Sequence, residues 1–287
     1  MIVQDEPAAT GVPLPVSALL AAELGVAAEQ AGFDGFFLWD HLSFSNDGDG
    51  PAVVDPWLVL AVIAAQTERI TIGTMITPIS RRRPAVLARQ TTTLDWLSHG
   101  RVVLGVGIGS PAIGDFGRFG DETDAVIRAE MLDEGLAVLD GLWSGERVDF
   151  HGGHYTVDGV TFRPRPVQRP RIPVWVGGTL PNRKPMSRAA RWDGAVPITW
   201  DDDRRLARPS AAQIAGVRDQ VLRERGHLDG FDLAVWAEVA PDPSGVASEL
   251  AAYEAAGATW WIETAKPEDG WLAGLTERIA HGPSGHQ

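Results

Sequence analysis

Hydrophobic and polar positions follow two patterns that alternate eight times along this chain. Long segments with apolar residues three and four positions apart predict helices, and short runs rich in Val, Ile, Phe and Trp predict strands. The short runs are almost continuously apolar, which is typical of strands in a parallel sheet that helices cover on its outer face. The alternation therefore predicts an α/β fold, a closed (β/α)8 TIM barrel with helices outside.

The expected helices share an apolar stripe and a polar face. They are Ser17–Ala31, Pro56–Thr67, Ala85–Leu97, Asp124–Trp143, Arg183–Trp192, Ala211–Arg225, Ser244–Ala256 and Glu268–Ala280. The clear strands are Gly35–Trp39, Ile70–Thr77, Val102–Val106, Ile172–Val176, Gly194–Ile198, Leu233–Val239 and Thr259–Thr264. The remaining barrel strand has to come first, where Met1–Gln4 offers only a short apolar run.

Local residue types mark several of the expected helix ends. Ser17 can cap the first helix, and Gly32 can end it in a left-handed conformation. Asp55 followed by Pro56 predicts a capped start with a proline in the first turn of the second helix. These signals support the helix boundaries independently of the apolar pattern.

Two intervals are longer than the usual connections in such a barrel. Gly107–Thr123 is rich in glycine and follows the fourth strand, and 144–171 contains two strand-like runs around Gly152-Gly153 that predict a β-hairpin. Long glycine-bearing insertions are more often lids than linkers. We therefore expect a single domain, 1–287, with insertions after strand four and in the 144–171 hairpin region.

Composition narrows the functional classes. The chain of 287 residues carries 38 acidic and 25 basic side chains, a formal charge of −13, which argues against nucleic-acid and anionic-membrane partners. It contains no cysteine, which excludes disulfides, thiolate metal sites and cysteine nucleophiles. No apolar run approaches the roughly 20 residues of a membrane span. A cytoplasmic location is expected.

The first candidate for chemistry is Asp40-His41, which ends the second strand. Barrel enzymes place their catalytic residues where strands lead into helices. His41 could transfer a proton or bind a polarised ring, and Asp40 could fix its tautomer or bind a ligand hydroxyl. The alternative is an aspartate that caps local amides beside a buried histidine.

The second candidate is Gly177-Gly178-Thr179, which follows the fifth strand and leads into the helix that starts at Arg183. Glycine lets the backbone approach an anion closely, and unpaired N–H groups at a helix start attract phosphate. Arg183 and Lys184 add two positive charges. The pattern predicts a phosphate site, although turns use paired glycines freely.

The glycines of Gly105–Ser110 alternate at the end of the fourth strand and resemble a dinucleotide fingerprint only superficially. No helix begins immediately after them, which argues against a Rossmann site. Two interpretations stay open. The backbone of this segment either passes close to something flat, or packs tightly inside the barrel.

Other groups at strand ends have less specific interpretations. Arg81-Arg82-Arg83 could attract an anion, but solvated surface charge is the favoured interpretation. Glu238 and Glu263 could face the cavity, although salt bridges to arginine are the usual outcome for such carboxylates. Trp200 and Trp261 could line an apolar pocket.

A metal site is a weak alternative. Of seven histidines only His41 lies at an expected strand end, and no His-x-His pair occurs there. His151 and His154 flank the glycine turn of the expected hairpin, which suits solvent better than zinc. We expect no metal.

The combination of motifs resembles the bacterial luciferase-like monooxygenase family, whose members are flavin- and deazaflavin-dependent oxidoreductases. The matching segments are collinear from about residue 17 to 198. They are Ala28–Gly35, Trp39–Leu42, Thr67–Thr74, Thr93–Arg101, Gly105–Gly109, Trp175–Gly178 and Arg188–Gly194.

The resemblance implies a (β/α)8 barrel with reduced FMN or coenzyme F420 at its C-terminal mouth, the ring lying against strands two to four. It implies that Asp40 and His41 lie near the reactive ring, and that Met75-Ile76 forms a third-strand bulge where the deazaflavin branch often has a non-proline cis peptide. The residues implied to bind the coenzyme are Met75, Ile76, Gly107, Gly109, Ser110, Gly177, Gly178 and Thr179. A homodimer is a further expectation from the family.

The chain also departs from the family pattern. Its first strand is short, and Met75 stands where a small residue is usual in the bulge. Ser110 replaces a glutamate that sugar-phosphate dehydrogenases of the deazaflavin branch carry, which argues against that activity. Ser98-His99-Gly100 replaces the commoner Ser-Gly-Gly.

The sequence thus predicts a flavin-type oxidoreductase or monooxygenase that uses reduced FMN or F420 to oxidise or reduce a small organic substrate. His41 would be the proton donor or would position the ring, with Asp40 as its partner. The alternatives are a non-catalytic flavin-binding paralogue of the same barrel, which the short first strand would explain, and a metal-dependent barrel hydrolase.

Overall fold

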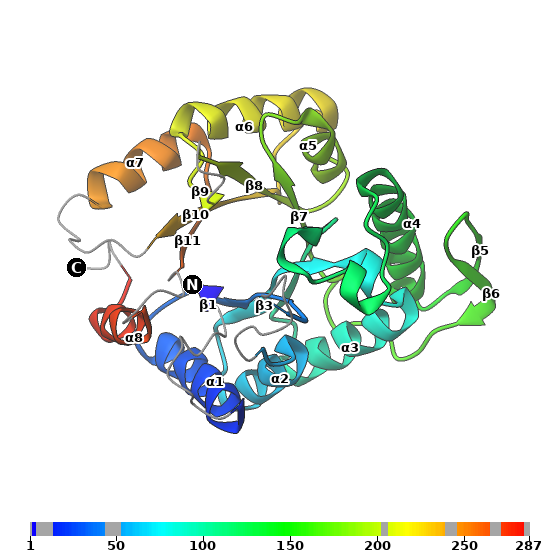
Figure 1. The fold of residues 1–287 in the computed structure, drawn as a ribbon, viewed down its shortest axis with the longest axis horizontal. Coiled ribbons are helices and arrows are strands. Elements are labelled where there is room, and N and C mark those ends of the chain that lie inside the picture. The colour runs from blue at the N-terminus through cyan, green and yellow to red at the C-terminus, as the bar shows by residue number, and fades with distance from the viewer. Residues whose placement is uncertain are drawn as a thin grey trace.

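A closed barrel of parallel strands forms the centre of the protein (Figure 1). The computed structural model describes residues 2–3, 14–43, 53–201, 206–238, 246–264 and 271–283. The barrel strands are β1 (Ile2–Val3), β2 (Gly35–Leu38), β3 (Thr71–Pro78), β4 (Val102–Gly107), β7 (Val174–Thr179), β8 (Gly194–Trp200), β10 (Asp232–Glu238) and β11 (Trp260–Thr264). They pair in that order, and pairing of β10 with β8 and of β11 with β1 closes the ring.

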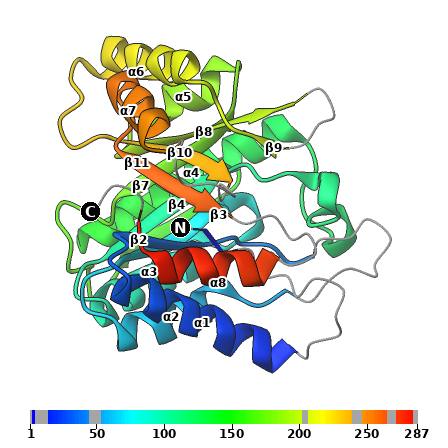
Figure 2. The same ribbon diagram turned by 90° about the vertical axis from the view of Figure 1, so that its left-hand side faces the viewer.

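Helices surround the strands, as the perpendicular view shows (Figure 2). They are α1 (Leu14–Gln30), α2 (Pro56–Gln66), α3 (Pro84–Leu97), α4 (Ala125–Ser144), α5 (Arg183–Ala189), α6 (Ala211–Arg225), α7 (Val246–Ala256) and α8 (Trp271–His281). The predicted (β/α)8 barrel is confirmed. Among the helices of the described residues, none is both long and apolar enough to cross a membrane.

The short first strand completes the barrel. Ile2 is in register with Phe37 of β2 on one side and with Thr264 of β11 on the other, and Val3 is in register with Leu38. Two residues are therefore enough to join the first and last βα units.

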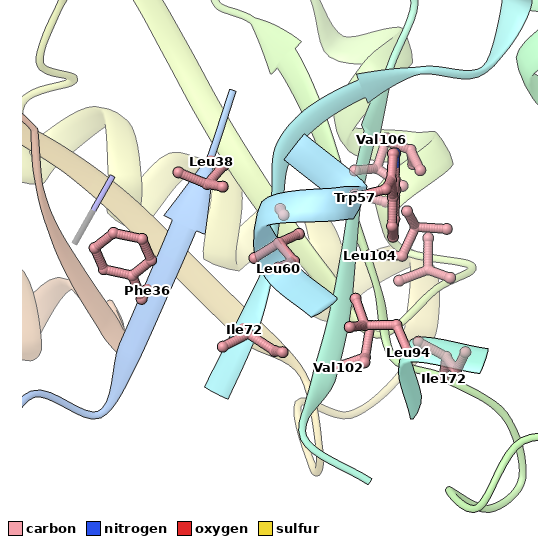
Figure 3. Close-up of a cluster of buried hydrophobic side chains, with 14 of the residues drawn as sticks. Phe36, Leu38, Trp57, Leu60, Ile72, Leu94, Val102, Leu104, Val106 and Ile172 are labelled. Atoms are coloured by element: carbon pink, nitrogen blue, oxygen red, sulfur yellow. The ribbon is translucent and has the colours of Figure 1, made fainter. Parts of the chain in front are cut away.

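An apolar layer fills the space between strands and helices. Figure 3 shows Trp57 and Leu60 of α2 with Ile72 of β3 and Leu104 and Val106 of β4, all of them buried. Each such side chain, once fully buried, stabilises the fold by about 1.5–3 kcal/mol. Residues on both faces of each strand are apolar, because the face that points into the barrel is buried as well as the face that the helices cover.

Aromatic side chains fill much of the barrel interior. Trp175 packs against Phe37 and Trp260 with ring centroids 5.5 and 5.3 Å away. Trp39, at the end of β2, stacks on Trp236 of β10 at 5.3 Å. These pairs give the barrel a packed core and leave its chemistry to the ends of the strands.

Most boundaries match the expectations, and the differences are local. Asp55 caps α2 by accepting hydrogen bonds from the N–H groups of Trp57 and Leu58 at 2.9 and 3.1 Å, as predicted. The cap expected at Ser17 is wrong, because α1 begins three residues earlier, at Leu14. A two-residue strand, β9 (Leu206–Ala207), pairs antiparallel with β8 and was not expected.

The two insertions occupy different places in the order of elements. The segment after β4 contains two 3-10 turns, η2 (Pro111–Ile113) and η3 (Gly117–Phe119), at the end where strands lead into helices. The antiparallel hairpin of β5 (Arg147–His151) and β6 (Thr156–Thr161) instead follows α4 and precedes β7.

The hairpin packs on the outside of α4 (Figure 1). The carboxylate of Glu134 in α4 accepts hydrogen bonds from the N–H groups of Gly153 and Tyr155 at 2.7 and 3.0 Å. These contacts place the hairpin against the outer side of α4, outside the ring of strands. A lid over the mouth is therefore the wrong interpretation of this insertion.

Candidate functional site

Asp40 lies two residues after the end of β2 and is completely buried. Arg82 donates from Nε and Nη2 to its two carboxylate oxygens at 2.7 and 2.6 Å, and Arg81 donates to Oδ1 at 3.1 Å and to the main-chain oxygen. Thr77 of β3 and Trp57 of α2 donate to Oδ2 at 2.7 and 3.4 Å. The carboxylate is thus the centre of a buried ion-pair network that joins β2, β3 and α2.

This network keeps Asp40 ionised. Burial acts to raise the pKa of Asp40, but the hydrogen bonds and charges of Arg82 and Arg81 outweigh it, and the pKa lies below its ordinary value. The interpretation of Arg81 and Arg82 as solvated surface charge is therefore wrong. A buried carboxylate at the end of the neighbouring strand draws both guanidinium groups inward, whereas Arg83 is exposed.

His41 follows Asp40 and lies at the barrel mouth with 21% of its side chain exposed. Its Nδ1 lies 3.0 Å from Oδ2 of Asp115, in the insertion after β4. An ionised carboxylate can only accept a hydrogen bond, so Nδ1 carries the proton and Nε2 carries the lone pair. The ring also meets Trp39 edge to face, with centroids 5.8 Å apart.

Asp115 was not expected at the site. It is buried, and its Oδ1 accepts hydrogen bonds from the N–H groups of Leu42 and Ser43 at 2.5 and 2.9 Å. Its Oδ2 also forms a salt bridge with Arg81. The carboxylate that meets Nδ1 of His41 is therefore that of Asp115, where we expected that of Asp40.

The surroundings of His41 favour the neutral imidazole. Burial, followed by the positive charge of Arg81, lowers its pKa to about 3, against the opposing effect of Asp40. At neutral pH the ring therefore carries one proton. Nε2 of such a ring accepts a proton or a hydrogen bond, and this favours a base over a proton donor.

The third strand has the bulge that the resemblance implies. The register between β3 and β4 shifts between Thr74 and Thr77, and the peptide bond from Met75 to Ile76 is cis. Met75 is buried and Ile76 is partly exposed. The larger side chain of Met75 is accommodated in the barrel core.

The glycines at the ends of β4 and β7 surround Ile76. A Cβ atom on Gly107 would lie 3.3 Å from Cγ2 of Ile76, and one on Gly177 would lie 2.0 Å from its Cδ1. Gly109 has a φ of +70°, and a Cβ there would lie 2.4 Å from the ring of Phe116. Close packing therefore accounts for these three positions, and Ser110 caps η2 by accepting a hydrogen bond from Ala112 N–H at 3.4 Å.

At the start of α5, where a phosphate site is predicted, positively charged side chains are more available than free main-chain N–H groups. Asn182 caps the helix by accepting a hydrogen bond from Lys184 N–H at 3.1 Å, and Pro185 has no N–H to donate. A Cβ on Gly178 would lie 2.0 Å from Cβ of Pro185, so this glycine is needed for packing. Thr179, Arg183 and Lys184 are exposed beside it.

The remaining candidates lie on β8, β10 and β11. Trp200 is exposed, and Trp261 packs against Tyr253 of α7 at 5.3 Å, outside the barrel. Glu263 forms the expected salt bridge, with Arg278 at 2.6 Å. The side chain of Glu238 lies outside the described residues.

One group of side chains in the described part of the chain has metal-ligand spacing. Asp149, His151 and Asp158 lie on the β5–β6 hairpin, with their ligand atoms within 4.8 Å of one another. All three are exposed, and His151 already contacts Asp149 at 2.8 Å. The group is remote from His41, and we assign it no role.

Comparison with known proteins identifies relatives of most of the chain. The luciferase-like monooxygenase family matches residues 18–282. The F420-dependent glucose-6-phosphate dehydrogenase of Microbacterium testaceum is 38% identical over 161 residues, which are 55% of this chain and 46% of the relative. The F420-dependent hydroxymycolic acid dehydrogenase of Mycobacterium tuberculosis is 34% identical over 212 residues, 70% of this chain and 56% of the relative. The chain spans about half the length of these curated relatives.

Solved structures share the fold over the whole chain. An F420-dependent secondary alcohol dehydrogenase in complex with an F420-acetone adduct has a TM-score of 0.76 at 18% identity, covering 100% of this chain and 99% of that one. The F420-dependent tetrahydromethanopterin reductase of Methanopyrus kandleri has a TM-score of 0.73 at 16% identity, covering 98% and 97%. At these identities the likeness shows the fold alone.

Proposed function

The chain belongs to the luciferase-like monooxygenase family, and on this premise we propose that it is an oxidoreductase that binds coenzyme F420 at the C-terminal mouth of its barrel. The observation that carries the proposal is the placement of His41. A neutral imidazole, held by a buried carboxylate, lies at the end of β2, beside β3 with its bulge. Such a group can accept a proton from a substrate at the mouth.

Two observations support F420 over FMN as the coenzyme. The curated relatives with 34–38% identity described above carry F420 dependence in their names. Arg183 and Lys184, both exposed at the start of α5, provide positive charge for an acidic coenzyme tail. FMN is the competing coenzyme in the tests below.

The residues at the mouth fit such a coenzyme. The ends of β3, β4 and β7 offer partly exposed apolar and glycine backbone, on which a flat ring can lie. The residues that would hold the ring are Met75, Ile76, Gly107, Gly109 and Ser110, and those that would hold the phosphate are Gly177, Gly178 and Thr179. Because Asn182 and Pro185 reduce the free amides of α5, we assign much of the anion binding to Arg183 and Lys184.

The protein residues supply the proton chemistry. When bound, F420 provides a two-electron carrier that accepts or donates a hydride. In the oxidative direction Nε2 of His41 takes the hydroxyl proton of an alcohol as the carbonyl forms. Asp40 acts indirectly, because it holds Arg81 and Arg82. Trp39 and Trp236 fill the barrel interior beside the site and exclude water.

A small organic alcohol or its carbonyl product is the substrate class that we propose. The relatives are named as dehydrogenases of glucose-6-phosphate and of hydroxymycolic acid, two compounds that carry hydroxyl groups. Ser110 lacks the carboxylate expected of a sugar-phosphate dehydrogenase in this position, so we propose a substrate other than a sugar phosphate.

Homodimerisation and a cytoplasmic location complete the proposal. Helix α2, Pro56–Gln66, contains no charged residue, and its outer face exposes Leu58 at 72% and Val62 at 40%. An exposed apolar face on a helix is typical of a protein interface. A second copy of the chain is the partner that we propose for it.

Removal of the imidazole tests the proposed function directly. We expect His41→Ala to keep the circular dichroism of the wild type and to lower turnover of a secondary alcohol with F420 by at least about 100-fold. Absorbance of the oxidised coenzyme measures the rate. His151→Ala, on the exposed hairpin, is the matched control and should keep full activity. Full turnover by folded His41→Ala would contradict the proposal.

A further inference from the structure

We propose that Asp115 is a positioning residue that holds His41 in the Nδ1–H tautomer, so that Nε2 presents its lone pair to the substrate. This inference rests on the proposed function for its chemical purpose. It concerns a residue in the insertion after β4, 74 positions away from His41 in the chain.

The geometry fixes the carboxylate relative to the histidine. One oxygen of Asp115, Oδ1, accepts hydrogen bonds from the main-chain N–H groups of Leu42 and Ser43, the two residues that follow His41. The other oxygen, Oδ2, faces Nδ1 of His41 at 3.0 Å. The same side chain therefore holds both the backbone and the ring of this segment, and its burial to 1% exposure keeps water from competing.

The bond between Oδ2 and Nδ1 selects one of the two neutral tautomers. With the proton on Nδ1 the contact is a charge-assisted hydrogen bond. With the proton on Nε2, a nitrogen lone pair would face a carboxylate oxygen, and the contact would be repulsive. The carboxylate thus leaves Nε2 as the proton acceptor, the state that a base needs before it meets an alcohol.

Arg81 keeps this state neutral. A carboxylate alone next to an imidazole would raise the pKa of the ring, but the buried guanidinium of Arg81 binds both Asp115 and Asp40. Within the described part of the chain, Arg81, Asp40 and Asp115 are the charged groups whose effect on His41 or contact with it is established. The positive charge of Arg81 acts to lower the pKa of His41. The carboxylate of Asp115 can therefore orient the ring while the ring stays neutral.

The substitution Asp115→Asn separates two roles of this side chain, which are to orient the His41 ring and to hold the backbone of Leu42 and Ser43. The asparagine oxygen can still accept the hydrogen bonds of Leu42 and Ser43, which would preserve the loop. Its NH2 group would then replace Oδ2, so that Arg81 would lose this salt bridge and keep its bond to Asp40. Because the NH2 group donates, Nδ1 would have to accept. The proton of His41 would move to Nε2, and the ring would lose its acceptor toward the mouth.

Nitrogen NMR of the protein without coenzyme shows directly which ring nitrogen of His41 carries the proton. Protein labelled with 15N-histidine gives two-bond proton–nitrogen correlations that distinguish Nδ1–H, Nε2–H and the cation, and the His41 signals are those missing from His41→Gln. We expect the Nδ1–H pattern in the wild type at pH 7 and the Nε2–H pattern in Asp115→Asn. The Nε2–H or cationic pattern in the wild type would overturn the proposal, and so would an unchanged pattern in folded Asp115→Asn.

Kinetics provide the second readout. Asp115→Asn should lower kcat for alcohol oxidation by about 100-fold with KM changed by less than about threefold, because the substrate site is kept and the base is lost. Asp115→Glu, which retains a carboxylate, should recover part of the loss, and Asp158→Asn on the hairpin should keep wild-type values. Unchanged kcat in Asp115→Asn would contradict the positioning role.

The two proposals can fail separately. Since the NMR spectra need no coenzyme, failure of F420 binding would refute the proposed function and leave the tautomer assignment standing.

Discussion

Two buried carboxylates organise the mouth of this barrel, and each has its own partner. Asp40 binds Arg81, Arg82 and Thr77, whereas Asp115 binds the ring of His41 and the backbone that follows it. The sequence could place Asp40 and His41 at the site, because an apolar run ends immediately before them. It could not identify Asp115, because this residue lies in a glycine-rich segment without periodicity and meets His41 only through the closed barrel.

The depressed pKa of His41 predicts acid sensitivity. In the unfolded chain this histidine takes up a proton below its ordinary pKa of about 6.5, whereas in the folded protein it does so only near 3. Protons therefore favour the unfolded state between these values, and the stability that the neutral ring confers is lost as the pH falls from 6.5 toward 3. At pH 5 the loss attributable to His41 should be about 2 kcal/mol relative to pH 8.

Urea unfolding of the wild type and of His41→Gln at both pH values measures this difference. The wild type should lose more free energy of unfolding between pH 8 and pH 5 than the variant does. An equal loss in the two proteins would show that His41 titrates normally.

At the scale of helices and strands, the apolar pattern and the end signals determined most of the architecture. The strand runs and the Asp55 cap were predicted because both faces of a covered parallel strand are apolar and because the signals for capping are local. The role of the β5–β6 hairpin was misread, because the end of the barrel on which a connection lies follows from element order rather than from composition. The end of α5 at Ala189, before Trp192, is another local difference that composition did not indicate.

Helix α4 offers a test of the local signals for helix capping. Asp124 caps it by accepting hydrogen bonds from the N–H groups of Val126 and Ile127 at 2.7 and 3.1 Å. Asp124→Ala should lower the free energy of unfolding by about 1 kcal/mol. Urea titration measures the change, with Glu146→Ala as an exposed control expected to lie within about 0.5 kcal/mol of the wild type. If Asp124→Ala lowers the free energy of unfolding no more than Glu146→Ala does, the cap does not stabilise the helix.

On the scale of the whole molecule, the packed core of the barrel leaves room for chemistry only at the ends of the strands. The outer surfaces of the helices remain available for contact with a second copy of the chain. The barrel fold was predictable because eight alternations admit few other arrangements. The single-domain organisation and the dimer stay predictions. Helix α2 is apolar on its inner and outer faces, and burial within one chain requires only the inner face.

A charge on the outer face of α2 tests the dimer. Leu58→Glu should convert a wild-type dimer into a monomer, because the interface would have to bury an unpaired carboxylate. Light scattering after size-exclusion chromatography measures the mass. Leu222→Glu, an exposed leucine on α6, is the matched control and should remain a dimer. A monomeric wild type would contradict the prediction.

The central claim is that the barrel mouth binds F420, and equilibrium titration tests it most directly. Coenzyme fluorescence during titration with the wild-type protein should show saturable binding in the micromolar range, tighter than for FMN under the same conditions. The double variant Arg183→Glu and Lys184→Glu should bind at least about tenfold more weakly, since each reversal removes an attraction and adds a repulsion. Arg223→Glu on α6 should bind as the wild type does. The absence of saturable binding of F420 to the folded wild-type protein would contradict the account.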